Sequence, residues 1–126
     1  MTPPRDGAEL VLIVEDDAET AQSLAEVLQL LGYDSDVVEN GKLALEYLRN
    51  APGRYCLVFL DVMMPVMDGW EFLTEQRSDA TIGEIPVVIV SAVPNVETRA
   101  RKTTAVGVLP KPIDPVKLEA TLQQYC

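Results

Sequence analysis

The chain is constrained most by four short apolar runs, each followed at once or within two residues by a charged or hydroxyl side chain. The runs are LVLIV at 10–14, CLVFL at 56–60, PVVIV at 86–90 and GVL at 107–109. An apolar run without polar alternation is typical of a strand that is buried on both faces. Such strands belong to parallel sheets covered by helices, so the runs predict an α/β fold.

The segments between these runs carry helical patterns and one weaker strand. A helix that ends near Gly32 is predicted after the first run, with apolar positions at the spacing of one helical face: Leu24, Val27, Leu28 and Leu31. A strand with interleaved charges is predicted around 35–38, nearer an edge. Further helices are predicted around Leu45 and Leu48, around Phe72 and Leu73, from about 95 to 105, and from Asp114 with Pro115 at its first position. The pattern predicts a doubly wound sheet of five parallel strands with helices on both faces.

Length and charge limit the functions that the chain can have. Its 126 residues suit one compact domain, predicted over 9–126 with a flexible tail at 1–8. The net charge of −10 disfavours binding to nucleic acid or to an anionic membrane surface. No apolar run approaches the roughly 20 residues needed to cross a bilayer. The sequence has no histidine, which excludes a histidine-based catalytic triad and a role as a phosphohistidine carrier.

The two cysteines predict no disulfide. Cys56 lies in an apolar run that is expected to be core, and Cys126, at the end of the sequence, is expected to be mobile. Two such cysteines do not make a disulfide framework, so a reducing cytoplasm is the predicted location.

The polar residues that follow the runs are the candidate site. Glu15-Asp16-Asp17, Asp61, Ser91 and Lys111 each come after a different predicted strand. The carboxyl ends of parallel strands meet at one edge of the sheet, where ligands bind in open α/β folds. Each residue alone has an ordinary explanation, and Asp17 can equally be the N-cap of the first helix. Their convergence on one edge favours a site.

The chemistry of this set favours phosphoryl transfer. Several carboxylates in one cleft repel one another unless a cation is present, and their hard oxygens suit Mg²⁺. Asp61 can attack phosphorus and become an acyl phosphate. The Lys111 ammonium and the Ser91 hydroxyl can then stabilise the phosphoryl oxygens.

The sequence resembles response-regulator receivers of two-component systems from about residue 9 to 124. Four stretches carry the resemblance: VLIVEDD, LDVMMPVMDGW, VIVSA and LPKPI. The resemblance implies a flavodoxin-like fold with strand order 2-1-3-4-5 and a cis Lys111–Pro112 bond. It implies phosphorylation of Asp61, with Mg²⁺ held by Glu15, Asp16, Asp61 and the backbone carbonyl of Met63.

The resemblance also implies the roles of the remaining residues and the partners. Ser91 is the implied hydroxyl switch, and Lys111 is the implied charge partner of the phosphate. The phosphoryl donor is a histidine kinase or a histidine phosphotransfer protein, and the output is a contact with an unidentified downstream protein. The chain is thus expected to be a cytoplasmic signalling domain, apparently stand-alone, that catalyses only its own phosphorylation and dephosphorylation.

Two features depart from the family pattern. Val108 stands where receivers usually carry an aromatic residue or histidine, and the segment from Ser91 to Lys111 is about two residues shorter than usual. The expected signal route is therefore the loop from Ser91 to Val96 and the helix after it. Met63 and Val93 are apolar and unsuited to position an attacking water, which predicts a long-lived phosphoryl group.

Two other functions stay open from the residues. A receiver fold can serve as an interaction module that phosphorylation does not regulate. A Mg²⁺-dependent phosphohydrolase usually needs a second Asp two residues after its nucleophile, where this chain has Met63. A nuclease-like Asp-x-Asp site fails for the same reason, and no glycine-rich loop for a nucleotide or a flavin is present.

Overall fold

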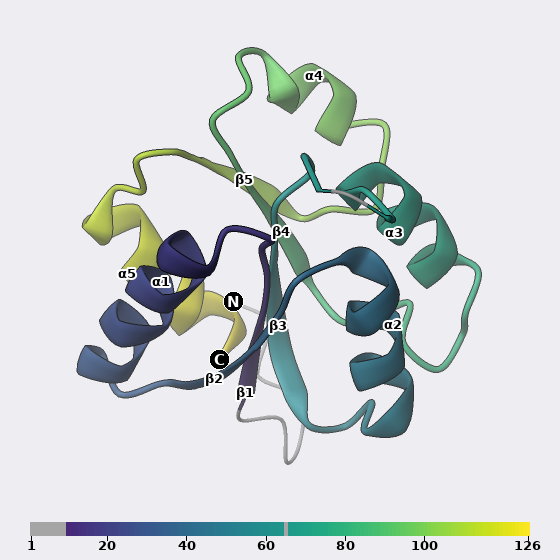
Figure 1. The fold of residues 1–126 in the computed structure, drawn as a ribbon, viewed down its shortest axis with the longest axis horizontal. Helices are drawn as coiled ribbons and strands as arrows, with labels where there is room; N and C mark the ends of the chain where they lie inside the picture. Colours follow the sequence, from purple (N-terminus) through teal and green to yellow (C-terminus); the bar gives the residue numbers. More distant parts are fainter. Residues whose placement is uncertain (1–9, 65) are drawn as a thin grey trace.

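The computed structural model describes residues 10–64 and 66–126, so the predicted tail at 1–8 and the residue Pro65 lie outside the described part. Strands and helices alternate strictly along the chain (Figure 1). The elements are β1 (Leu10–Val14), α1 (Ala18–Leu30), β2 (Asp34–Val38), α2 (Gly41–Asn50), β3 (Tyr55–Leu60), α3 (Gly69–Arg77), β4 (Val87–Ser91), α4 (Val96–Ala100), β5 (Gly107–Pro110) and α5 (Pro115–Tyr125). All strand pairs are parallel, and their order is β2-β1-β3-β4-β5, as predicted.

Two helical layers cover the sheet. Helices α1 and α5 lie on one face, and α2, α3 and α4 lie on the other (Figure 1). Buried side chains form one cluster under each layer, with Leu28 and Leu118 on the α1/α5 face and Leu48 and Phe72 on the α2/α3 face. The central strands supply both clusters, because successive side chains of a strand point to opposite faces. This explains why their sequences are continuously apolar.

The register of the sheet brings the ends of the strands together. Val14 at the end of β1 is the neighbour of Leu60 at the end of β3, and Ser91 on β4 is the neighbour of Pro110 on β5. Parallel strands joined by helical crossovers all run in one direction, so their carboxyl ends form one edge. The residues that follow these strands therefore meet there.

Three predicted details of the elements are corrected. Ser91 is the last residue of β4, not the first residue after it. Val27 is 39% exposed, although it belongs to the apolar face that was predicted for the first helix. Helix α4 spans only Val96–Ala100, not 95 to 105, because the turns after it bond three residues back and the Thr103 hydroxyl donates to the Ala100 carbonyl oxygen.

The prediction of no disulfide is also wrong, because Cys56 and Cys126 are bonded with their Cα atoms 5.4 Å apart. The register between β1 and β3 shifts after Leu10, which leaves Cys56 as an extra residue in β3. Cys56 and Leu57, although adjacent in sequence, therefore both pack into the cluster under α1 and α5. Cys126 follows α5 and packs against the same cluster, so it is held rather than mobile.

Within residues 10–64 and 66–126, no helix is both long enough and apolar enough to cross a bilayer.

Candidate functional site

Three carboxylates meet where the sequence predicts them. Glu15, Asp16 and Asp61 each place one oxygen within 4.8 Å of the others. The Glu15 N–H donates to the Val38 carbonyl and the Asp61 N–H to the Val14 carbonyl, which anchors both backbones to neighbouring strands. Glu15 is 6% exposed and Asp61 is 9% exposed, whereas Asp16 is open to solvent. Neighbouring strand ends thus hold a compact acidic group at the carboxyl edge of the sheet.

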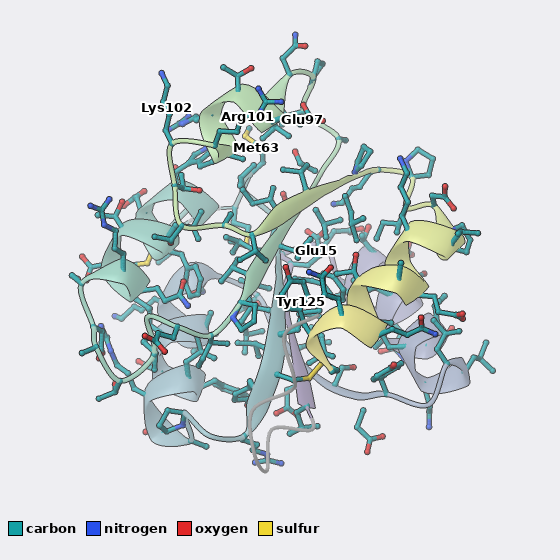
Figure 2. The ribbon with its side chains drawn as sticks, turned by 180° about the vertical axis from the view of Figure 1, so that it is seen from behind. Glu15, Met63, Glu97, Arg101, Lys102 and Tyr125 are labelled. Carbon is teal, nitrogen blue, oxygen red and sulfur yellow. A yellow bond between two sulfur atoms is a disulfide. The ribbon has the colours of Figure 1, made fainter. Side chains whose placement is uncertain are left out.

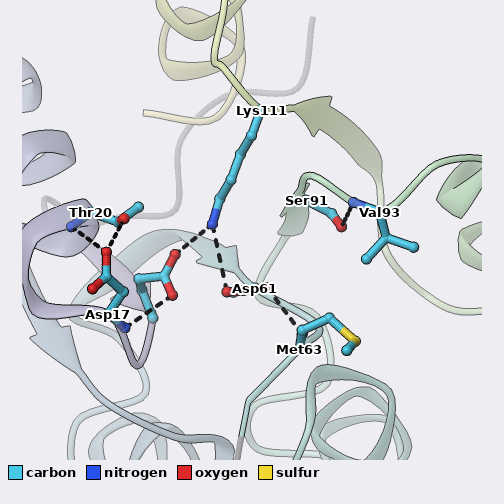
Figure 3. Close-up of polar contacts among 8 residues, drawn as sticks. Asp17, Thr20, Asp61, Met63, Ser91, Val93 and Lys111 are labelled. Carbon is cyan, nitrogen blue, oxygen red and sulfur yellow. Dashed lines mark hydrogen bonds and ion pairs between the residues drawn. The ribbon is translucent and has the colours of Figure 1, made fainter.

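Lys111 joins this acidic group from β5's side. Its Nζ lies 2.6 Å from Glu15 Oε1 and 3.6 Å from Asp61 Oδ2 (Figure 3). Partial burial alone lowers the pKa of the Lys111 ammonium. The hydrogen bond to Glu15 and the negative charges of Asp61 and Glu15 outweigh that effect and raise the pKa above its ordinary value. Lys111 is therefore a fixed positive charge that neutralises only part of the acidic group.

The loop after β3 closes against the Asp61 carboxylate. The Met63 N–H donates to Asp61 Oδ1 at 3.0 Å, and the Gly69 N–H donates to the Val62 carbonyl. The Met63 side chain takes no part in this hydrogen bond and is 66% exposed. A backbone donor on one carboxylate oxygen and Lys111 beside the other fix the orientation of the carboxylate (Figure 3).

Asp17 is a capping residue rather than a fourth member of the acidic group. Its carboxylate accepts from both the backbone N–H and the hydroxyl of Thr20, the arrangement of a helix N-cap. The pKa of the Asp17 carboxyl is lowered, chiefly by the hydrogen bond from the Thr20 hydroxyl. The alternative that the sequence left open for Asp17 is therefore confirmed.

Ser91 lies on the strand next to β3 and is buried. Its hydroxyl oxygen accepts from the Val93 N–H at 2.9 Å (Figure 3). Its carbonyl accepts from the Lys111 N–H. The Ser91 hydroxyl is thus bonded to the loop that leads to α4, while the Ser91 carbonyl is bonded to the backbone of Lys111. Ser91 therefore connects the end of β4 to the residue that follows β5. The Lys111–Pro112 bond is cis, as predicted.

A cavity of about 300 Å³ between α1 and α5 opens beside these groups, and the sequence did not predict it. Glu15, Asp61 and Lys111 line its polar end, and Leu24, Val27 and Leu118 are among its apolar walls. Val27 belongs to the predicted apolar face of the first helix, but the structure leaves it partly exposed because it lines this cavity. Its apolar character alone does not reveal a cavity.

Comparison with known protein families identifies the same kind of domain. The family model of the response regulator receiver domain matches residues 11–123, which is most of the chain. The chain belongs to this family. Receiver domains are signalling domains of two-component systems rather than classical enzymes, and they bind Mg²⁺ at an acidic site.

Several relatives of this receiver domain are known. The two-component response regulator ORR5 of Oryza sativa subsp. japonica is 34% identical over 114 residues, which cover 88% of this chain and 84% of ORR5. The transcriptional regulatory protein PcoR of Escherichia coli is 34% identical over 115 residues, which cover 90% of this chain and 49% of PcoR. The chain thus spans about half of PcoR, and only 25% of ZraR of Escherichia coli, another relative.

The fold of the receiver domain is also that of solved structures. The chemotaxis protein CheY4 of Vibrio cholerae superposes with a TM-score of 0.82 at 30% identity, covering 94% of this chain and 99% of CheY4. A sensor protein from Polaromonas superposes with a TM-score of 0.81 at 30% identity, covering 92% of this chain and 94% of that protein.

One contact in the receiver domain lies near the departures from the family pattern. The Arg99 guanidinium of α4 stacks over the Trp70 ring of α3, 4.3 Å from its centroid. Trp70 and Val108 both pack, partly buried, against the cluster under α2 and α3. Trp70 is therefore a packing residue, and it links α3 to α4.

Proposed function

We propose that this receiver domain accepts a phosphoryl group on Asp61, with Mg²⁺ bound by the neighbouring carboxylates. The observation that carries the proposal is the meeting of Glu15, Asp16 and Asp61 within 4.8 Å, with the Lys111 ammonium reaching two of them. A donor phosphohistidine from a kinase or a phosphotransfer protein is the proposed substrate, since the chain has no histidine of its own.

The donor set fits Mg²⁺. Three carboxylates carry up to three negative charges in a small space, and the single ammonium of Lys111 leaves an excess that a divalent cation can neutralise. Carboxylate oxygens at an edge that is open on the Asp16 side also suit an ion that keeps several waters. Glu15, Asp16 and Asp61 would hold the ion, with the Met63 carbonyl as a further proposed ligand. When bound, Mg²⁺ neutralises developing charge on the phosphoryl oxygens.

The residues of the chain then perform the transfer by position and charge. An Asp61 oxygen forms the bond to phosphorus as the bond from phosphorus to the donor nitrogen breaks. The Met63 N–H and the Lys111 ammonium, which already flank the Asp61 carboxylate, stabilise the charge that moves onto the phosphoryl group. Glu15 holds Lys111 at 2.6 Å and so positions the ammonium before the donor arrives.

Incubation with acetyl phosphate and Mg²⁺ tests this proposal. We expect the intact mass to rise by one phosphoryl group, and Asp61→Asn to abolish the gain. Asp34→Asn is the matched control, because Asp34 is an exposed carboxylate that begins β2, at the opposite edge of the sheet. An unchanged mass in the wild-type chain would indicate an interaction module, and release of phosphate from esters without a stable adduct would indicate a phosphohydrolase. Loss of the label with time gives the phosphoryl lifetime, which we expect to be long.

We further propose that the Ser91 hydroxyl carries the signal. Its present partner is the Val93 N–H, so a turn of the hydroxyl toward a phosphoryl oxygen frees the loop that enters α4. With Mg²⁺ and beryllofluoride, a phosphoryl mimic, we expect amide resonances to shift from Ser91 through Ala105. Ser91→Ala should confine the shifts to the neighbourhood of Asp61. Shifts confined there in the wild-type chain would contradict the proposed route.

The proposed output is a contact with a downstream protein at the surface that this loop and α4 form. We keep the cytoplasm as the proposed location, because a kinase domain would supply the phosphoryl group there. The Cys56–Cys126 disulfide removes the argument for a reducing compartment that rested on two unpaired cysteines, since stable disulfides are rare in such compartments.

A further inference from the structure

The cysteine pair lies at the edge of the sheet opposite the candidate functional site. Cys56 is the second residue of β3, whereas Asp61 follows the last residue of that strand. Cys126 follows α5, whose first residue comes four positions after Lys111. The disulfide therefore joins the end of a helix to the start of the strand that carries Asp61, and it lies below Tyr125 in Figure 2. The proposed phosphoryl chemistry does not use either sulfur.

The bulge in β3 points Cys56 at α5. A regular strand would alternate its side chains, so that Cys56 and Leu57 would face opposite layers. Here the extra residue in β3 puts both side chains into the cluster under α1 and α5, while Tyr55 packs on the other side. Bulges commonly serve to redirect a side chain. The backbone at this point is thus arranged for a bond between Cys56 and the α5 layer.

The two sulfurs differ in access. Cys56 is 1% exposed, whereas Cys126 is only partly buried and is held by one backbone hydrogen bond, from its N–H to the Leu122 carbonyl oxygen. Thiol–disulfide exchange requires an attacking thiolate to reach a sulfur, so the accessible point of attack is the Cys126 sulfur. Cys56 is correspondingly the leaving group.

The protein also accommodates the reduced state. The Cys56 Sγ lies 3.4 Å from the Leu10 carbonyl oxygen. In the disulfide this sulfur has no hydrogen to donate, but the reduced thiol gains an acceptor at hydrogen-bonding distance without moving. A thiol is also a small apolar group that suits the surrounding cluster. Cys56 can therefore be buried as a thiol as well as in a disulfide.

We propose that Cys56–Cys126 is a reversible redox site whose substrate is a dithiol reductant and whose state decides whether the end of α5 is fastened to β3. One thiolate of the reductant attacks the Cys126 sulfur, the bond to Cys56 breaks, and Cys56 leaves as a thiolate that takes up a proton. The second thiol of the reductant then displaces Cys126 and closes the reductant's own disulfide. Two electrons pass to the protein, which ends with two thiols.

Reduction loosens α5 locally. Without the covalent bond, the last turn of the helix is held by the buried Leu122 side chain, by Tyr125, which packs only partly buried against the same cluster, and by backbone bonds at the helix end that fray readily. A disulfide oxidant such as oxidised glutathione restores the attachment by the reverse exchange, and it takes up the two electrons as it becomes two thiols. The redox state thus determines how firmly the end of α5 is held against β3, independently of any phosphoryl group on Asp61.

The test uses the full chain after treatment with oxidised glutathione or with dithiothreitol. We expect no maleimide-reactive thiol in the denatured oxidised form and two in the denatured reduced form. In the folded reduced form, Cys126 should react faster than Cys56. Amide hydrogen exchange from Leu122 to Cys126 should become roughly tenfold faster on reduction.

Cys126→Ser is the matched control, because it removes the accessible sulfur and leaves Cys56 beside its carbonyl acceptor. Its exchange at the end of α5 should match that of the reduced wild-type chain, and dithiothreitol should not change it. Two reactive thiols after oxidation, a disulfide between two chains, or equal α5 exchange in both redox forms would each overturn the proposal.

Discussion

Gly69 shows how a single residue fixes the loop that carries Asp61. A Cβ atom built on Gly69 would lie 2.6 Å from the Val62 Cα and 2.8 Å from the Asp61 carbonyl oxygen. Both are backbone atoms, so no flexible side chain can move away. The glycine lets the start of α3 pack directly on the loop after β3, where its N–H donates to the Val62 carbonyl. The position of Asp61 therefore depends on a residue that never touches a ligand.

At this scale we predict that Gly69→Ala lowers the free energy of unfolding by about 1–3 kcal/mol, since the added methyl group has to displace backbone. Urea denaturation measures the change. Gly53→Ala is the matched control, because nothing lies within 4 Å of a Cβ at that position, and we expect the midpoint of its unfolding to stay close to that of the wild-type chain. Equal midpoints for the two variants would contradict the close approach.

At the scale of elements, side-chain bonds shape the connection from α3 to β4. The buried Gln76 amide donates to the carbonyl oxygens of Ile82 and Ile85, which satisfies backbone groups that no helix or strand uses. Asp79 accepts from the Thr81 hydroxyl and N–H, and from Arg49 at the end of α2. This connection is thus tied both to its own helix and to a neighbouring one.

These bonds predict a shifted titration. The Thr81 hydroxyl first, and then Arg49, lower the pKa of the Asp79 carboxyl from 3.8 to about 2. The stability that this shift contributes is present above pH 3.8 and is lost as the pH falls through about 2. We expect an NMR titration to show the low pKa, with Thr81→Ala raising it more than Arg49→Ala. The reverse order would mean that the ion pair, which is exposed on the Arg49 side, dominates.

At the scale of the whole molecule, net charge makes the fold responsive to cations. The chain carries a charge of −10, and three of its carboxylates share one edge of the sheet with a single lysine. Repulsion within this group opposes the folded state, and the unfolded chain relieves it by separating strands that are distant in sequence. A cation that binds only the folded acidic group should therefore stabilise the whole domain.

We predict that Mg²⁺ at 100 times its dissociation constant raises the free energy of unfolding by about 2.7 kcal/mol relative to the chain in chelator. Thermal unfolding with and without Mg²⁺ measures the effect. Asp16→Asn should reduce it strongly, whereas Asp34→Asn, which removes the same charge at the opposite edge of the sheet, should not. An identical response in both variants would show general screening instead of a site.

Much of the fold follows from local pattern. The apolar runs gave β1 with the bounds that were predicted and β3, β4 and β5 to within one residue at each end, because a buried strand requires an uninterrupted apolar stretch. The cap at Asp114 was predicted correctly because a carboxylate before a helix satisfies free N–H groups. The length of α4 was predicted wrongly, because the Thr103 hydroxyl competes for the Ala100 carbonyl oxygen, which a longer helix would use in its backbone.

Three features follow from the amino-acid sequence alone: the class of fold, the edge where the polar residues meet, and the grouping of Glu15, Asp61 and Lys111. These depend on strand direction, which periodicity and chain order reveal. Three others became evident only in the folded chain: Asp17 caps α1, a cavity opens between α1 and α5, and Cys56 meets Cys126. The last contact depends on a one-residue bulge in β3, and a shift of one residue turns a side chain to the other face of a sheet without leaving any mark in the hydrophobic pattern.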